Sequence, residues 1–107
     1  MAELQTATVG ANHKLVIKNI GLMLSGDIER PILEADTLVA IGGRIAAVGR
    51  FKDLDTDQAD TVIDANGTVL SPGLIDSHVH PVAGDWTPRQ NQLGWIDSTM
   101  HGGVTTM

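Results

Sequence analysis

Two histidines separated by one residue are the side chains of this sequence best placed to do chemistry. His78 and His80 lie in the segment PGLIDSHVHP, residues 72–81, together with Asp76. Side chains alternate between the two faces of a strand, so in a strand all three would project to one side. Two imidazoles spaced about 7 Å apart along a strand can converge on one divalent ion. A bare His-x-His is a weak pattern, because two histidines can equally be partly buried and hydrogen-bonded.

The metal ligands available to this chain are imidazoles and carboxylates, because the sequence contains no cysteine. Borderline-soft imidazole suits Zn²⁺, and Fe²⁺ or Mn²⁺ would also fit. Catalytic zinc sites use about three protein ligands and structural sites about four, so His78 and His80 alone form part of a site. We expect Asp76 to orient a ligating imidazole or to line the interior beside it.

A strand, a helix and a second strand are predicted around the histidine pair. Residues 74–80 predict the first strand, which ends before a proline. Thr87-Pro88-Arg89-Gln90 fits a capped helix start, and Gly102-Gly103 fits a helix stop. Residues 104–106 begin another β-prone run. This order predicts the first β-α-β unit of a parallel α/β barrel, which would place the pair at the catalytic end of the barrel.

The preceding residues are β-rich and predict a small separate domain. A hairpin is predicted over residues 37–48, because Gly42-Gly43 readily takes the positive φ angles of a two-residue turn. A second hairpin is predicted over residues 61–70, turning near Asn66-Gly67. A short strand is expected at residues 15–17. Up to residue 70 the pattern is typical of a small antiparallel sheet or half of a sandwich.

Composition excludes several classes of function. The 107 residues carry a formal net charge of −6, which disfavours binding to nucleic acid or to an anionic membrane surface. No apolar run approaches the roughly 18 residues of a membrane span. The first twelve residues lack a basic leader followed by a long apolar run, so we expect no secretory signal and a cytoplasmic location.

The segment PGLIDSHVHP resembles the barrel-opening motif of the amidohydrolase superfamily of metal-dependent hydrolases. ADTLVAIGGRIAAVG and TVIDANGTVLSPG are similar to the N-terminal part of that family's small β-sandwich, and HGGVTTM is similar to its second barrel strand. The resemblance covers residues 14–107. It implies an α/β fold that is incomplete on this chain: a leader at 1–12, part of a composite β-sandwich at 13–72, and the start of a TIM-like (β/α)8 barrel at 73–107.

The resemblance also implies a function. His78 and His80 would bind one or two divalent ions, zinc first, and metal-activated water would cleave the carbon–nitrogen bond of an amide. IKNIG, SGDIERPILEADT, GDWTPRQ and HGGVTTM are similar to the cyclic-enamide hydrolases of nicotinate fermentation. That likeness implies a small cyclic enamide bearing a carboxylate, such as tetrahydro-6-oxonicotinate. Hydantoinase- or dihydropyrimidinase-type enzymes and N-acyl amino acid hydrolases are the alternatives within the family.

Two alternatives have no catalytic role. A non-catalytic scaffold relative would be expected to lose its metal ligands, whereas this chain keeps both histidines. A free-standing β-sandwich interaction module ending near Leu70 would leave the His-x-His strand and the helix after it unexplained.

The same resemblance implies metal ligands that lie outside this chain. They are a bridging carboxylated lysine or a glutamate, two further histidines and a catalytic aspartate, so we expect no general base among the 107 residues. We therefore expect a complementary polypeptide that carries barrel strands 3–8, and we expect the protein to form a homo-oligomer. Arg89 could hold a substrate carboxylate with its two-pronged donor geometry. The alternative for Arg89 is a solvated helix N-terminus.

Overall fold

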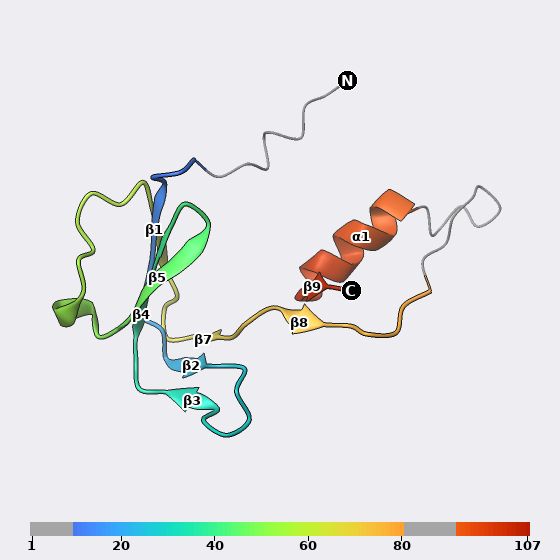
Figure 1. Ribbon diagram of the computed structural model, residues 1–107, viewed down its shortest axis with the longest axis horizontal. Helices are drawn as coiled ribbons and strands as arrows, with labels where there is room; N and C mark the ends of the chain where they lie inside the picture. Colours follow the sequence, from blue (N-terminus) through green and yellow to red (C-terminus); the bar gives the residue numbers. More distant parts are fainter. Residues whose placement is uncertain (1–9, 81–91) are drawn as a thin grey trace. The chain divides into compact units, whose positions relative to one another are not determined.

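The computed structural model describes residues 10–80 and 92–107 (Figure 1). The chain divides into two compact units, with the boundary between Ser71 and Pro72. The first unit contains two small sheets, and the second contains a two-stranded sheet and a helix. Over the described residues, no helix is long and apolar enough to cross a membrane.

The larger sheet of the first unit has the strand order β5-β4-β1-β6. Its members are β1 (Lys14–Lys18), β4 (Thr37–Ile41), β5 (Arg44–Gly49) and β6 (Thr61–Asp64). β1 pairs antiparallel with β4 and parallel with β6. β4 and β5 form the predicted hairpin, and the two turn glycines have φ angles of 60° and 82°. The hairpin around Gly42-Gly43 is therefore confirmed.

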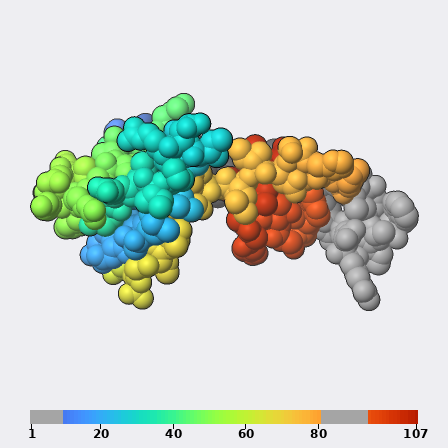
Figure 2. Space-filling view, turned by 90° about the horizontal axis from the view of Figure 1, so that it is seen from below, coloured from blue at the N-terminus to red at the C-terminus, as the bar shows by residue number. Residues whose placement is uncertain are grey.

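The smaller sheet has the order β3-β2-β7. It contains β2 (Leu22–Leu24), β3 (Ile32–Leu33) and β7 (Val69–Leu70). A 3-10 helix, η2 (Phe51–Asp53), follows the β4–β5 hairpin of the larger sheet. β2 pairs antiparallel with β3 and parallel with β7. The segment from β2 to β3 lies on the surface of this unit, where its cyan atoms are visible in Figure 2 and Ile28 is 92% exposed.

The predicted second hairpin is wrong, although the turn inside it is real. Asn66 and Gly67 do adopt positive φ angles of 52° and 81°. The chain leaves this turn into the other sheet, because β6 pairs with β1 and β7 pairs with β2, both in parallel. The first unit thus consists of two mixed sheets, so of the two expected patterns the small antiparallel sheet is wrong.

Two chain segments bend side by side from the larger sheet into the smaller one. β1 continues into β2 through residues 19–21, and β6 continues into β7 through residues 65–68. The Gly67 amide donates to the Asn19 carbonyl at 2.7 Å, and the Gly21 amide donates to the Thr68 carbonyl at 2.9 Å. These bonds satisfy backbone groups at the bend, which explains why the parallel pairing persists across it.

Replacing Gly21 by alanine should destabilise this corner. A Cβ at position 21 would lie 2.1 Å from the Gly67 carbonyl oxygen, which is backbone and cannot rotate away. We expect Gly21→Ala to lower the free energy of unfolding by about 2 kcal/mol or more. Urea denaturation measures this difference. The matched control is Gly10→Ala, whose Cβ would meet nothing within 4 Å; equal stabilities of the two variants would contradict the close approach.

The buried residues of the first unit come from both of its sheets and from the bend between them. Val16 and Val39 of the larger sheet are buried, as are Met23 of the smaller sheet and Ile20 in the bend. The other face of the larger sheet also carries apolar side chains, such as Ile45, which is 68% exposed. Because side chains alternate along each strand, this sheet has apolar residues on both faces.

Asp36 joins the bend to the hairpin. Its carbonyl accepts from the Ile20 amide, and its amide donates to the Gly49 carbonyl. Its carboxylate accepts from the Thr37 hydroxyl at 2.8 Å and from the Phe51 amide at 2.9 Å. These two hydrogen bonds, with a smaller contribution from the charge of Arg50, lower the pKa of Asp36 below its ordinary 3.8.

The lowered pKa of Asp36 predicts an acid-dependent part of the stability. A carboxylate whose pKa is lower in the folded state stabilises the fold above the unfolded value, and that stability is lost as pH falls through the folded pKa. Asp36→Asn keeps an acceptor oxygen but has no charge to lose. The stability difference between wild type and Asp36→Asn should therefore shrink as pH falls from about 5 to below 3.

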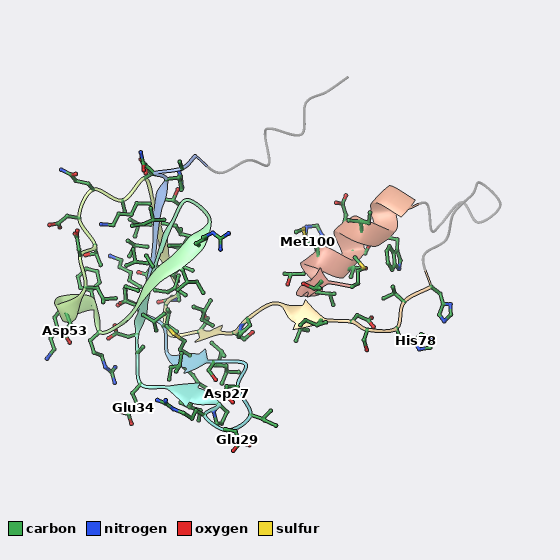
Figure 3. The ribbon with its side chains drawn as sticks, viewed as in Figure 1. Asp27, Glu29, Glu34, Asp53, His78 and Met100 are labelled. Atoms are coloured by element: carbon green, nitrogen blue, oxygen red, sulfur yellow. The ribbon has the colours of Figure 1, made fainter. Side chains whose placement is uncertain are left out.

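Urea denaturation at several pH values measures that change. Asp53→Asn is the control, because the Asp53 side chain extends from η2 into solvent (Figure 3). It removes the same charge without the contacts made by Asp36. A difference for Asp36→Asn that stays constant between pH 7 and pH 2 would contradict the assignment.

The second unit is a β-α-β unit, as predicted from the sequence. It comprises β8 (Leu74–Ile75), α1 (Gln92–His101) and β9 (Val104–Thr106), and β8 pairs in parallel with β9. The helix ends as predicted, since Gly103 has a φ of 94° and its amide donates to the Met100 carbonyl at 2.9 Å. The predicted helix start at Thr87 to Gln90, including Arg89, lies outside the described residues.

Candidate metal centre

The segment that carries the histidine pair leaves the sheet earlier than predicted. A strand was expected over residues 74–80, but β8 ends at Ile75. The last ladder contact is the Asp76 amide, which donates to the Thr106 carbonyl of β9 at 2.9 Å. β9 itself ends at Thr106, so residues 77–80 have no neighbouring strand in the described part of this unit. This corrects the predicted length of the strand.

The two imidazoles nevertheless converge. The Nε2 atoms of His78 and His80 are 2.8 Å apart, and the ring centroids are 4.8 Å apart with an interplanar angle of 53°. Both side chains are exposed, and Figure 3 shows that of His78 extending from the chain beyond β8. The prediction that the two side chains share one side is therefore confirmed in its geometry, even though the strand is short.

The arrangement of the pair fits a shared divalent ion. Two metal–nitrogen bonds of about 2.0–2.1 Å that meet at a right angle place their nitrogens roughly 2.9 Å apart. A tetrahedral angle between the bonds widens that separation to about 3.3 Å. The observed 2.8 Å is close to the first value and needs an opening of roughly 0.5 Å to reach the second. Two exposed imidazoles can make such a change by rotating their side chains.

Asp76 has a backbone partner in this structure. Its Oδ1 accepts a hydrogen bond from the main-chain amide of His78 at 3.0 Å. The sequence had suggested that Asp76 orients an imidazole, and sequence reasoning missed the backbone contact. The spacing itself could have revealed it, because an aspartate commonly accepts from the amide two residues later.

The described residues bring two candidate ligands together and form no complete site. Among residues 10–80 and 92–107, no group of three His, Cys, Asp or Glu side chains is placed to hold a metal ion. His13 belongs to the first unit, where its Nε2 lies 3.1 Å from the Thr61 hydroxyl. His101 is the last residue of α1. A catalytic zinc uses about three protein ligands, so any metal held by His78 and His80 needs at least one more.

Comparison with known proteins identifies the family. The chain is 53% identical to enamidase from Eubacterium barkeri over 95 residues, which are 88% of this chain. It is 44% identical over 90 residues to imidazolonepropionase from Paenarthrobacter aurescens (strain TC1), which covers 83% of this chain. A crystal structure of enamidase, described as a new member of the amidohydrolase superfamily, superposes on 88% of this chain with a TM-score of 0.74 and 50% identity. The chain belongs to the amidohydrolase superfamily.

This assignment confirms the resemblance found in the sequence, including its closeness to the cyclic-enamide hydrolases. No protein-family model matches the amidohydrolase chain as a whole or in part. The chain spans about a quarter of the length of the relatives it matches, 24% of enamidase and 22% of imidazolonepropionase. The likeness therefore concerns one segment of an amidohydrolase.

Proposed function

We propose that this amidohydrolase segment supplies two metal ligands, His78 and His80, to a hydrolase that cleaves a carbon–nitrogen bond other than a peptide bond. The observation that carries the proposal is the approach of their Nε2 atoms to 2.8 Å on the segment that follows β8. The enamidase and imidazolonepropionase likenesses support the reaction class. A bound divalent metal would supply an activated water and would polarise the carbonyl under attack.

The two imidazoles must present unprotonated nitrogens to bind. A ring nitrogen that ligates a metal carries no proton, so each ring would hold its remaining proton on Nδ1. The 2.8 Å Nε2–Nε2 contact requires one of the two Nε2 atoms to be the donor. Metal binding would therefore replace this hydrogen bond, and the donor ring would move its proton to Nδ1 or give it to solvent.

The rest of the site would come from polypeptide beyond the described residues. Two imidazoles fall short of the roughly three protein ligands of a catalytic zinc, and the relatives are about four times as long as this chain. In this proposal β8, α1 and β9 form the first β-α-β unit of a TIM-like barrel. The first unit forms part of a composite β-sandwich, and a complementary polypeptide carries the remaining barrel strands and the general base. The TM-score of 0.74 to enamidase, over 88% of this chain, supports the part of this arrangement that concerns the two units described here.

The substrate we favour is a small cyclic enamide that bears a carboxylate. The 53% identity to enamidase over most of this chain supports it. A second candidate is an imidazolone ring carrying a propionate, which the 44% identity to imidazolonepropionase favours. Both candidates are ring amides with an acidic substituent, so they share the attack of water on a cyclic carbon–nitrogen bond.

A ring-opening assay on a panel of substrates tests the choice. Tetrahydro-6-oxonicotinate, imidazolonepropionate, hydantoin and dihydrouracil would be offered to the complete zinc-loaded enzyme. We expect kcat/KM for the cyclic enamide to exceed that for each other ring by at least about 100-fold. Faster turnover of the imidazolone would move the assignment to the second candidate. Turnover of hydantoin without turnover of the enamide would contradict the substrate class while leaving the metal chemistry in place.

A further inference from the structure

The contact between Asp76 and His78 joins the metal segment to the sheet. The Asp76 amide is bonded to the Thr106 carbonyl of β9 at 2.9 Å, so the backbone of Asp76 is fixed to the ladder. Its carboxylate then accepts the amide of His78 at 3.0 Å. The Asp76 side chain therefore connects the backbone of His78 to the point where the last hydrogen bond between β8 and β9 is made.

The same type of bond occurs three more times among the residues that the structure describes. Each time an aspartate Oδ1 accepts from the backbone amide two residues later, at 2.8–3.1 Å: Asp27 with Glu29, Asp55 with Asp57, and Asp64 with Asn66. In all of them the carboxylate shapes the backbone locally, since the bond is made by an acceptor oxygen to a main-chain amide. Asp76 differs in one respect, because the amide that it holds belongs to a residue whose side chain faces His80.

The bond compensates for the early end of the strand. Beyond Ile75 the His78 backbone is outside β8, and an exposed segment of this kind samples many backbone angles unless a local contact restrains it. The position of the His78 imidazole depends on those angles, because its Nε2 lies several bonds from the backbone. Restraining the His78 amide therefore narrows the range of distances between the two Nε2 atoms.

We infer that Asp76 is a positioning residue for the metal pair, and that it acts through the backbone amide of His78 rather than through either imidazole or the metal. The inference rests on the proposed function for its metal, but the restraint on the backbone is independent of it. Since the bond needs an acceptor oxygen and no charge, an amide should replace the carboxylate. A carboxylate that ligated the metal would lose affinity in this exchange, and one that only oriented an imidazole would not restrain the amide of His78.

Two substitutions at Asp76 distinguish these roles. Asp76→Asn keeps the acceptor oxygen, whereas Asp76→Ala removes it. Asp27→Ala is the matched control, because it removes the same type of turn bond from an exposed position between β2 and β3, where Figure 3 labels Asp27 and Glu29. All three variants would be made in the complete protein.

Two measurements are needed, one with metal and one without. Competition with a chromophoric chelator gives the Zn²⁺ affinity, and hydrogen exchange of peptides covering residues 73–80 in the metal-free protein reports on the His78 amide. Asp76→Ala should weaken Zn²⁺ binding about tenfold and speed the exchange at least about tenfold. Asp76→Asn should stay within about twofold of wild type in both, and Asp27→Ala should change neither.

Results that differ from these expectations would overturn either the positioning role of Asp76 or the proposed function. If Asp76→Asn binds Zn²⁺ as weakly as Asp76→Ala, the charge is required and the positioning role is overturned. Unchanged exchange in Asp76→Ala overturns it as well. If the wild-type protein binds no Zn²⁺, the proposed function fails, and the exchange rates of the metal-free variants alone decide whether Asp76 restrains His78.

Discussion

Replacing both His78 and His80 by alanine is expected to remove at least one divalent ion per protomer and to lower turnover by more than roughly 1000-fold. The two Nε2 atoms approach to 2.8 Å, and the described residues offer no third ligand beside them. Without the pair, a metal would lose two of the roughly three protein ligands of a catalytic site. Elemental analysis of the purified protein and a ring-opening assay measure the two effects.

The chain provides its own control for this experiment. His13 and His101 are the other two histidines, one hydrogen-bonded to Thr61 in the first unit and one at the end of α1. Replacing both of them by alanine removes the same number of imidazoles and should leave metal content and turnover close to wild type. Unchanged metal content in the His78 and His80 double variant would refute the assignment of these two as ligands.

The isolated 107-residue chain should bind Zn²⁺ at least about 1000-fold more weakly than the complete enzyme. It contributes two imidazoles, and the ion would have to complete its coordination with water. The β8–β9 pair also has no further strand beside it among the described residues, with Leu74 57% exposed and Ile75 74% exposed. Unpaired edges and exposed apolar side chains favour aggregation, so we expect the isolated chain to be poorly soluble.

Adding the proposed complementary polypeptide, which would carry the remaining barrel strands, should restore both properties. Zinc affinity by chelator competition and amide NMR spectra, each recorded with and without that polypeptide, test the expectation. Sharp and dispersed amide signals across residues 74–80 and 92–107 of the isolated chain would count against it. Hydrolytic activity of the isolated chain would contradict it directly, because the general base would then have to lie among these 107 residues.

The parts of the fold that were predictable from the sequence are those decided by neighbouring residues. Gly42-Gly43 determines a hairpin because both residues take positive φ angles at little cost. Gly103 ends α1 for the same reason. The β-α-β unit follows from a strand, a helix and a strand in sequence, since a helical crossover between neighbouring strands makes them parallel.

The predictions that failed concern strand pairing, which depends on residues that are distant in the sequence. Asn66-Gly67 predicts a turn, and the turn is present, but the residues at a turn do not determine which strand will pair with the segment that follows. The pairing of β6 with β1 depends on residues more than 40 positions apart in the sequence. The strand expected over residues 74–80 is shorter than predicted because its partner β9 ends at Thr106, and beyond that point the Asp76 carboxylate accepts the amide of His78.

The candidate site could be predicted in part. The spacing of His78 and His80 was enough to expect two imidazoles on one side, and the structure brings them together. Their further partners could not be found, because a metal site collects ligands that are distant in sequence, and the described residues hold no cluster of three. Arg89 stays a prediction, since it lies outside the described residues.

Anomalous X-ray scattering at the zinc edge, recorded from crystals of the zinc-loaded complete protein, tests the central claim most directly. If His78 and His80 are metal ligands, an anomalous peak will lie about 2.0–2.1 Å from the Nε2 atoms of both. The same maps would show whether one ion or two occupy the site. Density for two imidazoles that remain hydrogen-bonded to each other at the 2.8 Å seen here, with zinc bound elsewhere or not at all, would contradict the claim.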